Sequence, residues 1–140
     1  MPNASGRFVH GELISAHELN TTTDLGAGSA SGAESWSVVD FHAHRSGPLL
    51  AFTTKVERVG TVISVRSDGD LDNELVAILP LECRGSIGWS QSVCSVHVGR
   101  RCAGFYDATT GGVHLASVEP AAGDISIGEE ITLGGVVLLD

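Results

Sequence analysis

The residues with the clearest capacity for chemistry are Asp40, His42 and His44, which alternate with apolar residues in the segment 39–44. Alternate residues of a β-strand point to the same face of a sheet, so these three side chains are expected to project together. Histidine nitrogens and carboxylate oxygens both bind zinc, at about 2.0–2.2 Å. The spacing therefore predicts that His42 and His44 can hold a metal ion, with Asp40 as a further ligand.

A second interpretation of this segment needs no metal. If Val39, Phe41 and Ala43 point into a core, the polar residues between them lie on a solvated outer face. A metal site would need a third ligand, for which the candidates besides Asp40 are His97, His114 and Cys94. We favour the solvated face over the metal site, and we expect no cofactor.

The pattern D-x-H-x-H formed by Asp40, His42 and His44 resembles the strand end that supplies metal ligands in the amidohydrolase superfamily. The resemblance covers the six residues 39–44. It implies a (β/α)8 barrel of about 250 residues, whereas this chain has 140 residues and no alternation of strand and helix patterns. The fold of that superfamily is therefore not expected here.

Four carboxylates occupy alternate positions of the segment 68–74, namely Asp68, Asp70, Asp72 and Glu74. Calcium takes about six to eight oxygen ligands, and calcium-binding loops begin with the pattern D-x-D-x-D. In the EF-hand pattern the sixth position is glycine and the twelfth is glutamate, where this chain has Asn73 and Leu79. We favour a solvated acidic turn, with a calcium site as the alternative.

No complete enzyme motif is present in the sequence. The segment 88–92 (GWSQS) approaches the G-x-S-x-G nucleophile elbow but ends in serine, and a strand pattern follows it where that elbow needs a helix. The three cysteines, Cys83, Cys94 and Cys102, form no C-x-x-C motif. They are expected to be reduced, buried, small apolar residues. We therefore lean against a catalytic role.

Length and charge limit the remaining classes. A chain of 140 residues has the size of one domain, so we expect a single β domain over 1–140. Its formal net charge of -9 disfavours nucleic acid as a partner, because such binding neutralises phosphates with Lys and Arg. No apolar run approaches the ~20 residues of a membrane span, and the N-terminus lacks a signal-peptide pattern. We expect a cytoplasmic protein, or one assembled into a particle made in the cytoplasm.

Short apolar stretches between glycine-rich turns predict an all-β fold, either a small antiparallel barrel or a sandwich. The first expected strand begins at Trp36, and the others are 49–56, 59–66, 74–79, 92–98, 102–107, 113–118, 125–127, 131–133 and 136–139. A three-residue hairpin loop at 99–101 would place Cys94 opposite Tyr106. Residues 20–35 are small and polar and predict a long N-terminal loop or flexible arm. Only residues 10–19 have a pattern compatible with a helix, and a strand fits that segment equally well.

The most apolar run stops one residue before the C-terminus and consists of Val136, Val137, Leu138 and Leu139. As an open edge it would invite aggregation, so it must lie inside the sheet or be covered by a neighbouring subunit. We therefore expect a non-catalytic structural or assembly module, working as a homo-oligomer or as an accessory component of a virus or phage particle. The alternatives are a small β-barrel enzyme or carrier, such as a cyclase-like protein enclosing an apolar metabolite, and a metal-binding protein that uses His42 and His44.

Overall fold

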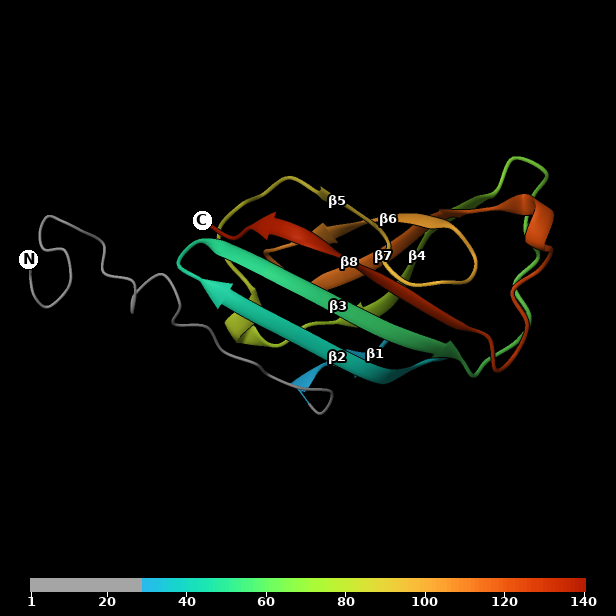
Figure 1. The fold of residues 1–140 in the computed structure, drawn as a ribbon, viewed down its shortest axis with the longest axis horizontal. Helices are drawn as coiled ribbons and strands as arrows, with labels where there is room; N and C mark the ends of the chain where they lie inside the picture. Colours follow the sequence, from blue (N-terminus) through green and yellow to red (C-terminus); the bar gives the residue numbers. More distant parts are fainter. Residues whose placement is uncertain (1–28) are drawn as a thin grey trace, which may run out of the picture.

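The computed structural model of the protein describes residues 29–140 (Figure 1). Its strands are β1 (Ser31–Gly32), β2 (Trp36–Ser46), β3 (Leu49–Arg58), β4 (Asp70–Ile78), β5 (Gln91–Ser95), β6 (Cys102–Asp107), β7 (Gly112–Val118) and β8 (Glu130–Leu138). Two short 3-10 helices, η2 (Leu81–Cys83) and η3 (Pro120–Ala122), lie in the connections. The prediction of an all-β fold is confirmed. The segment 10–19, for which helix and strand were both open, and residues 20–28 of the expected arm lie outside the described residues.

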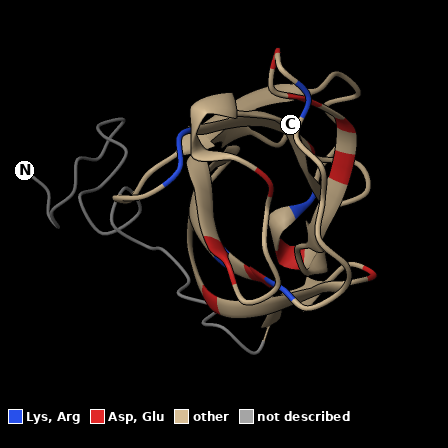
Figure 2. Ribbon diagram, turned by 90° about the vertical axis from the view of Figure 1, so that its right-hand side faces the viewer, with Lys and Arg blue, Asp and Glu red and all other residues tan. Residues whose placement is uncertain are grey.

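The strands form one antiparallel sheet in the order β1-β4-β7-β6-β5-β8-β3-β2. The two ends of this order meet, because β1 lies against β2. At the junction the N–H of Ala33 donates to the carbonyl of Val76 at 3.1 Å, and the N–H of Trp36 donates to the carbonyl of Ala33 at 2.9 Å. The result is a nearly closed barrel, with β2, β3 and β8 on one side and β4, β6 and β7 on the other (Figure 1). Figure 2 views the same barrel along its long axis, so that the strands surround the interior as a ring.

The interior of the barrel is filled by side chains that alternate along the strands. Leu50, Phe52 and Val56 of β3 point inward, as do Phe41 and Ala43 of β2, and each of them is at most 3% exposed. The largest fully buried side chains are Tyr106, Phe41, Leu50, Leu79, Leu115, Ile125, Leu133, Leu139, Val56, Val76, Val113 and Val137. The inside of the barrel is therefore a packed core.

Tyr106 connects this core to η2. Its ring lies 5.1 Å from that of Phe52, centroid to centroid, and its hydroxyl donates to the backbone carbonyl of Cys83. Burial raises the pKa of the Tyr106 phenol, so the hydroxyl stays protonated and keeps its role as a donor. The bond holds the segment after β4 against the barrel wall.

A partly buried ion pair joins β3 to β4 near the barrel junction. Arg58 Nη1 lies 3.3 Å from Glu74 Oε2, and the same oxygen accepts a bond of 3.1 Å from the indole nitrogen of Trp36. Arg58 Nε donates to the carbonyl of Thr61 at 2.8 Å, and its guanidinium stacks 5.0 Å from the Trp36 ring centroid. Because Arg58 is only 6% exposed, these contacts satisfy a charge that burial would otherwise penalise.

The prediction that Val39 faces the core is wrong. The pairing of β2 with β3 shifts between Val38 and Asp40, as in a β-bulge. A bulge inserts one residue and so reverses the alternation on one side of it. Val39 is consequently 41% exposed, whereas Val38 is partly buried against the core.

The expected strand at 59–66 does not form. The N–H groups of Val59 and Gly60 both donate to the carbonyl of Ser35, at 3.0 and 3.1 Å, so they are not available for a ladder. The only sheet pairing in this segment is a single bridge between Ile63 and Ile125. The expected strand at 125–127 does not form either, since Ile125 makes only this bridge.

The last two expected strands, 131–133 and 136–139, are one continuous strand, β8. The pair Gly134-Gly135 was expected to mark a turn and instead lies in the middle of this strand. A Cβ atom at Gly134 would lie 2.3 Å from the carbonyl oxygen of Phe52 on β3. The glycine thus permits a close approach of two backbones, which is the other common use of glycine in a strand.

The expected hairpin at 99–101 is also wrong, because β5 ends at Ser95 and Cys94 pairs with Ala103 instead of Tyr106. The longer connection is held by Arg100, which bonds Glu129 and the carbonyl of Gly123 at 2.6 and 2.7 Å. This attachment draws the loop away from the β5–β6 ladder. Cys83 and Cys102 are buried as expected, but Cys94 is exposed.

The end of the expected arm belongs to the sheet. Ser31 and Gly32 pair with Ile78 and Ala77 of β4, which ties residues 31–32 to the barrel. A Cβ atom at Gly32 would lie 2.2 Å from the carbonyl oxygen of Trp36, so this contact again requires glycine. Within the described part of the chain, no helix has the length and apolarity to cross a membrane.

Candidate functional site

The outer surface of β2, β3 and β8 carries the most distinctive group of exposed residues. We call it the front face and define it by Asp40, His42, His44, Leu49, Ala51, Thr53, Lys55, Glu57, Glu130, Thr132, Val136 and Leu138. Strand pairing arranges these residues in rows across the sheet. One row runs from His44 through Ala51 to Val136, and another from Asp40 through Lys55 to Thr132. The front face is therefore apolar toward the β2–β3 turn and polar toward the opposite end.

The apolar end depends on two cross-strand pairs. Leu49 lies opposite Leu138, and Ala51 lies opposite Val136. Leu49, Leu138 and Val136 are 46%, 42% and 68% exposed. A groove of about 310 Å³ runs over this area, with a predominantly apolar lining of His42, His44, Ala51, Phe52, Thr53, Val96, Gly135 and Val136. The end thus presents large aliphatic side chains around a shallow hollow.

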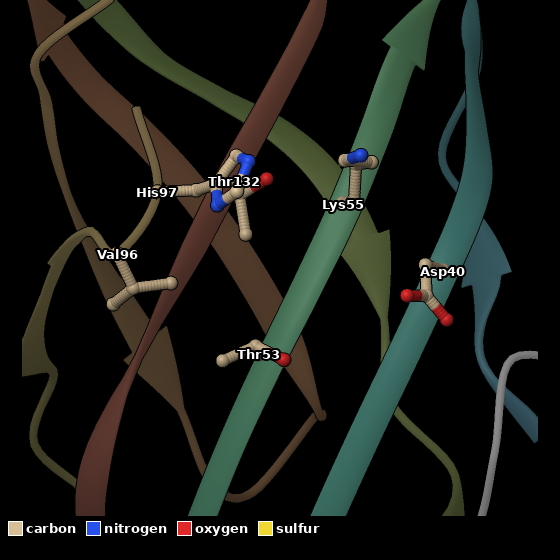
Figure 3. Close-up of a pocket in the computed structure, with 6 residues that line it drawn as sticks. All are labelled: Asp40, Thr53, Lys55, Val96, His97 and Thr132. Atoms are coloured by element: carbon tan, nitrogen blue, oxygen red, sulfur yellow. The ribbon is translucent and has the colours of Figure 1, made fainter. Parts of the chain in front are cut away.

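The polar end holds a second hollow of about 210 Å³, lined by Asp40, Thr53, Lys55, Val96, His97 and Thr132 (Figure 3). Lys55 lies on β3, between β2 and β8. Its cross-strand partners are Asp40 on β2 and Thr132 on β8. Its ammonium lies 3.6 Å from Glu130 Oε1. The two hollows share Thr53 and Val96 in their linings, so they lie next to each other on the front face.

Carboxylates outnumber cations at this polar end. Asp40, Glu57 and Glu130 are accompanied by Lys55, the only lysine of the chain. Glu57 and Glu130 are direct cross-strand partners, an arrangement that costs free energy because like charges face each other. Lys55 offsets part of this repulsion through its contact with Glu130.

The structure brings Asp40 and His42 together. Asp40 Oδ1 lies 3.2 Å from His42 Nε2 and also accepts the N–H of Phe41 at 3.0 Å. His44 projects from the same face of β2, two residues further on, and is also exposed. Zinc accepts nitrogen and carboxylate ligands of this kind, so these side chains are the ones that could hold a metal.

The other suggested zinc ligands are dispersed. His97 lines the polar hollow together with Asp40, but His114 stacks on Phe105 at a ring distance of 4.5 Å on the opposite side of the barrel. Burial lowers the pKa of the His114 imidazole. Across residues 29–140, no group of three or more His, Cys, Asp or Glu side chains is placed to hold one metal ion. A complete site would need ligands from outside this part of a single chain.

Three of the four suggested calcium ligands are bonded to two arginines. Arg66 bonds Asp70 at 2.9 Å and Asp72 at 2.5 Å, while Glu74 turns toward Arg58. Asp68 accepts the N–H of Asp70 at 3.0 Å, which is a local turn contact. Asp72 and the residue after it adopt positive φ, and the pairing of β4 with β7 shifts here. The segment therefore forms a turn in which Arg66 is the cation that the carboxylates bond.

The suggested interface run is half buried. Val137 and Leu139 point into the core at 2% and 0% exposure, so only Val136 and Leu138 reach the surface. Their front-face neighbours on β3 belong to no motif that marks them in the sequence. The alternation of Leu49, Ala51, Thr53 and Lys55 was visible, but nothing in the sequence placed it beside β8. The GWSQS segment leads directly into β5, and Trp89 within it is 63% exposed.

The chain matches no family model, no curated protein and no solved structure. Any statement about its function therefore rests on the geometry of the front face and on the charge of the chain.

Proposed function

We propose that the protein is a non-catalytic assembly module that forms a homo-oligomer through its front face. The observation that carries the proposal is the aliphatic surface formed by Leu49, Leu138, Ala51 and Val136. Single exposed apolar residues are ordinary, but a contiguous group on the outer surface of a sheet is typical of an interaction site. A larger assembly, such as a virus or phage particle, would use the same surface between its subunits.

The front face can supply a large part of a dimer interface. β3 has ten residues, which at about 3.3 Å each give a length of about 33 Å. β2, β3 and β8 at about 4.8 Å spacing give a width of about 14 Å. The projected area is about 460 Å², and the accessible surface of the side chains exceeds the projected area. A standard interface buries about 800 Å² per partner, so the front face can supply a large part of that area.

The packed interior favours this role over that of a carrier. A barrel that encloses a metabolite needs a lumen of about 300 Å³ or more with converging polar groups. Here the corresponding space is occupied by Tyr106, Phe41 and Leu133, all fully buried. The hollows on the front face are open and shallow by comparison, and suit contact with a protein surface.

Sedimentation velocity on the full-length protein tests the proposal. We expect a concentration-dependent dimer or higher oligomer, and we expect Val136→Asp to weaken it, because a carboxylate would lose its hydration inside an apolar contact. Ile127→Asp is the matched control, since Ile127 is 63% exposed and lies outside the front face, against 68% for Val136. A wild-type protein that stays monomeric at high concentration would overturn the proposal. Equal effects of the two substitutions would also overturn it.

A further inference from the structure

We propose that Asp40 and His42 form one half of a zinc site that is completed by the same two residues of a second copy of the chain. The site would have four ligands, two from each copy, and would lie between two front faces in contact. It rests on the proposed function, because a single chain cannot complete it.

The separation of the two side chains already suits a shared metal ion. Two ligands at about 2.0–2.1 Å from one zinc ion, in tetrahedral geometry, lie about 3.3–3.4 Å from each other. Asp40 Oδ1 and His42 Nε2 lie 3.2 Å apart. The N–H of Phe41 donates to the same carboxylate oxygen at 3.0 Å, which holds the carboxylate beside the imidazole. A zinc ion could therefore be bound with little rearrangement of either side chain.

One chain supplies too few ligands for a zinc site. A structural zinc ion takes four, and the described residues contain no group of three that could hold a metal. Asp40 and His42 have side chains that are 54% and 55% exposed on the outer surface of β2. A second copy packed on the front face could supply the missing pair of ligands.

The excess negative charge of the front face favours binding of a divalent cation between two copies of the chain. Asp40, Glu57 and Glu130 against Lys55 leave two negative charges in excess on each polar end. Two polar ends brought together would repel each other, and a net charge of -9 per chain adds to this repulsion. A zinc ion between the two Asp40 carboxylates would offset part of it. Zinc binding and self-association would then strengthen each other, as linkage requires.

The experiment uses full-length protein that has been treated with a chelator and then dialysed free of it. Sedimentation velocity is measured without metal, with zinc chloride and with magnesium chloride. We expect zinc to tighten self-association by roughly 5–150-fold, the usual range for coupled binding events. Magnesium should have little effect, since it prefers oxygen ligands and near-ideal octahedral geometry. Calorimetric titration should give one zinc ion per two chains.

Substitutions then identify the ligands. Asp40→Asn and His42→Ala should each abolish the zinc effect. His44→Ala is the matched control, because His44 is a histidine on the same exposed face of the same strand, and it should leave the zinc effect in place. Circular dichroism spectra of all variants should match the wild type, since the three side chains are exposed.

Each of the other outcomes would contradict one part of the proposal. Self-association that zinc does not change would remove the metal site and leave the proposed function standing. A monomer both with and without zinc would remove both. One zinc ion per chain, without tighter association, would contradict the bridging geometry. Loss of the zinc effect in His44→Ala would contradict the choice of Asp40 and His42 as ligands.

Discussion

The two adjacent glycines of β8 allow a sharp test of the packing between β3 and β8. A Cβ atom at Gly134 would lie 2.3 Å from the carbonyl oxygen of Phe52 and 3.1 Å from Thr53 Cα, both of them backbone atoms. At Gly135 the nearest atom would be Val93 Cγ1 at 3.6 Å, an ordinary van der Waals distance. Neither glycine has positive φ, so alanine is compatible with the backbone at both positions. The two substitutions differ mainly in the space available to one methyl group.

The magnitude follows from this difference. Gly134→Ala must push β3 and β8 apart, and forcing extra carbon into a packed region typically costs about 1–3 kcal/mol. Gly135→Ala meets no obstacle and reduces the entropy of the unfolded chain, which stabilises by about 0.4–1 kcal/mol where the conformation permits. We therefore expect the free energies of unfolding of the two variants to differ by about 1.4–4 kcal/mol.

Urea denaturation measures this difference directly, and a thermal melt should show it as roughly 2–8 °C per kcal/mol. Both variants should be compared with wild type at one protein concentration, because self-association would itself shift the apparent stability. The reasoning would be refuted by equal stabilities of the two variants, or by Gly135→Ala being the less stable one.

Three further predictions concern the buried Tyr106 and Cys83. Tyr106→Phe should lower the free energy of unfolding by about 1–3 kcal/mol, because the carbonyl of Cys83 loses its donor inside the core; unchanged stability in urea would argue against that bond. At pH 8 iodoacetamide should alkylate the exposed Cys94 first and spare Cys83, since burial raises the pKa of the Cys83 thiol to about 11, and mass spectrometry of the digested protein would show the order. Because the pKa of Cys83 is raised in the folded state, its contribution to stability should be complete below about pH 9 and lost as the pH rises toward 11.

The strands that the sequence predicted well are those with local signals. β6 was expected at 102–107 and spans Cys102–Asp107, and β7 was expected one residue short at 113–118. In both cases turn residues flank a short apolar alternation, which is enough to locate a strand. Glycine is less informative, because it occurs both in turns and where two backbones approach each other closely. Gly134-Gly135 falls between two expected strands and so suggests a turn. Only the neighbouring strand β3 shows that Gly134 instead permits a close contact between two backbones.

The candidate site depends on contacts that are distant in sequence. Asp40, His42 and His44 could be placed on one face from their spacing alone, and the structure shows them on the outer surface of β2. Their neighbours could not be inferred, because β3 and β8 pair across nearly 90 residues, as Leu49 with Leu138. The loop after β5 was missed for a similar reason. Arg100 reaches Glu129 and the backbone beyond η3, and no local pattern indicates that attachment.

The position of β8 determines what kind of contact its apolar side chains can make. β8 pairs with β3 along its length and with β5 at Gly134 and Leu133. At the start of β5, the side-chain amide of Gln91 bonds both the carbonyl and the N–H of Leu138, at 2.6 and 2.7 Å, and so takes the place of backbone pairing between β5 and β8. With these backbone groups satisfied, another chain has little to gain by adding a strand at this edge. Val136 and Leu138 can then be covered only through their side chains, which favours packing of one front face on another over pairing of strand edges.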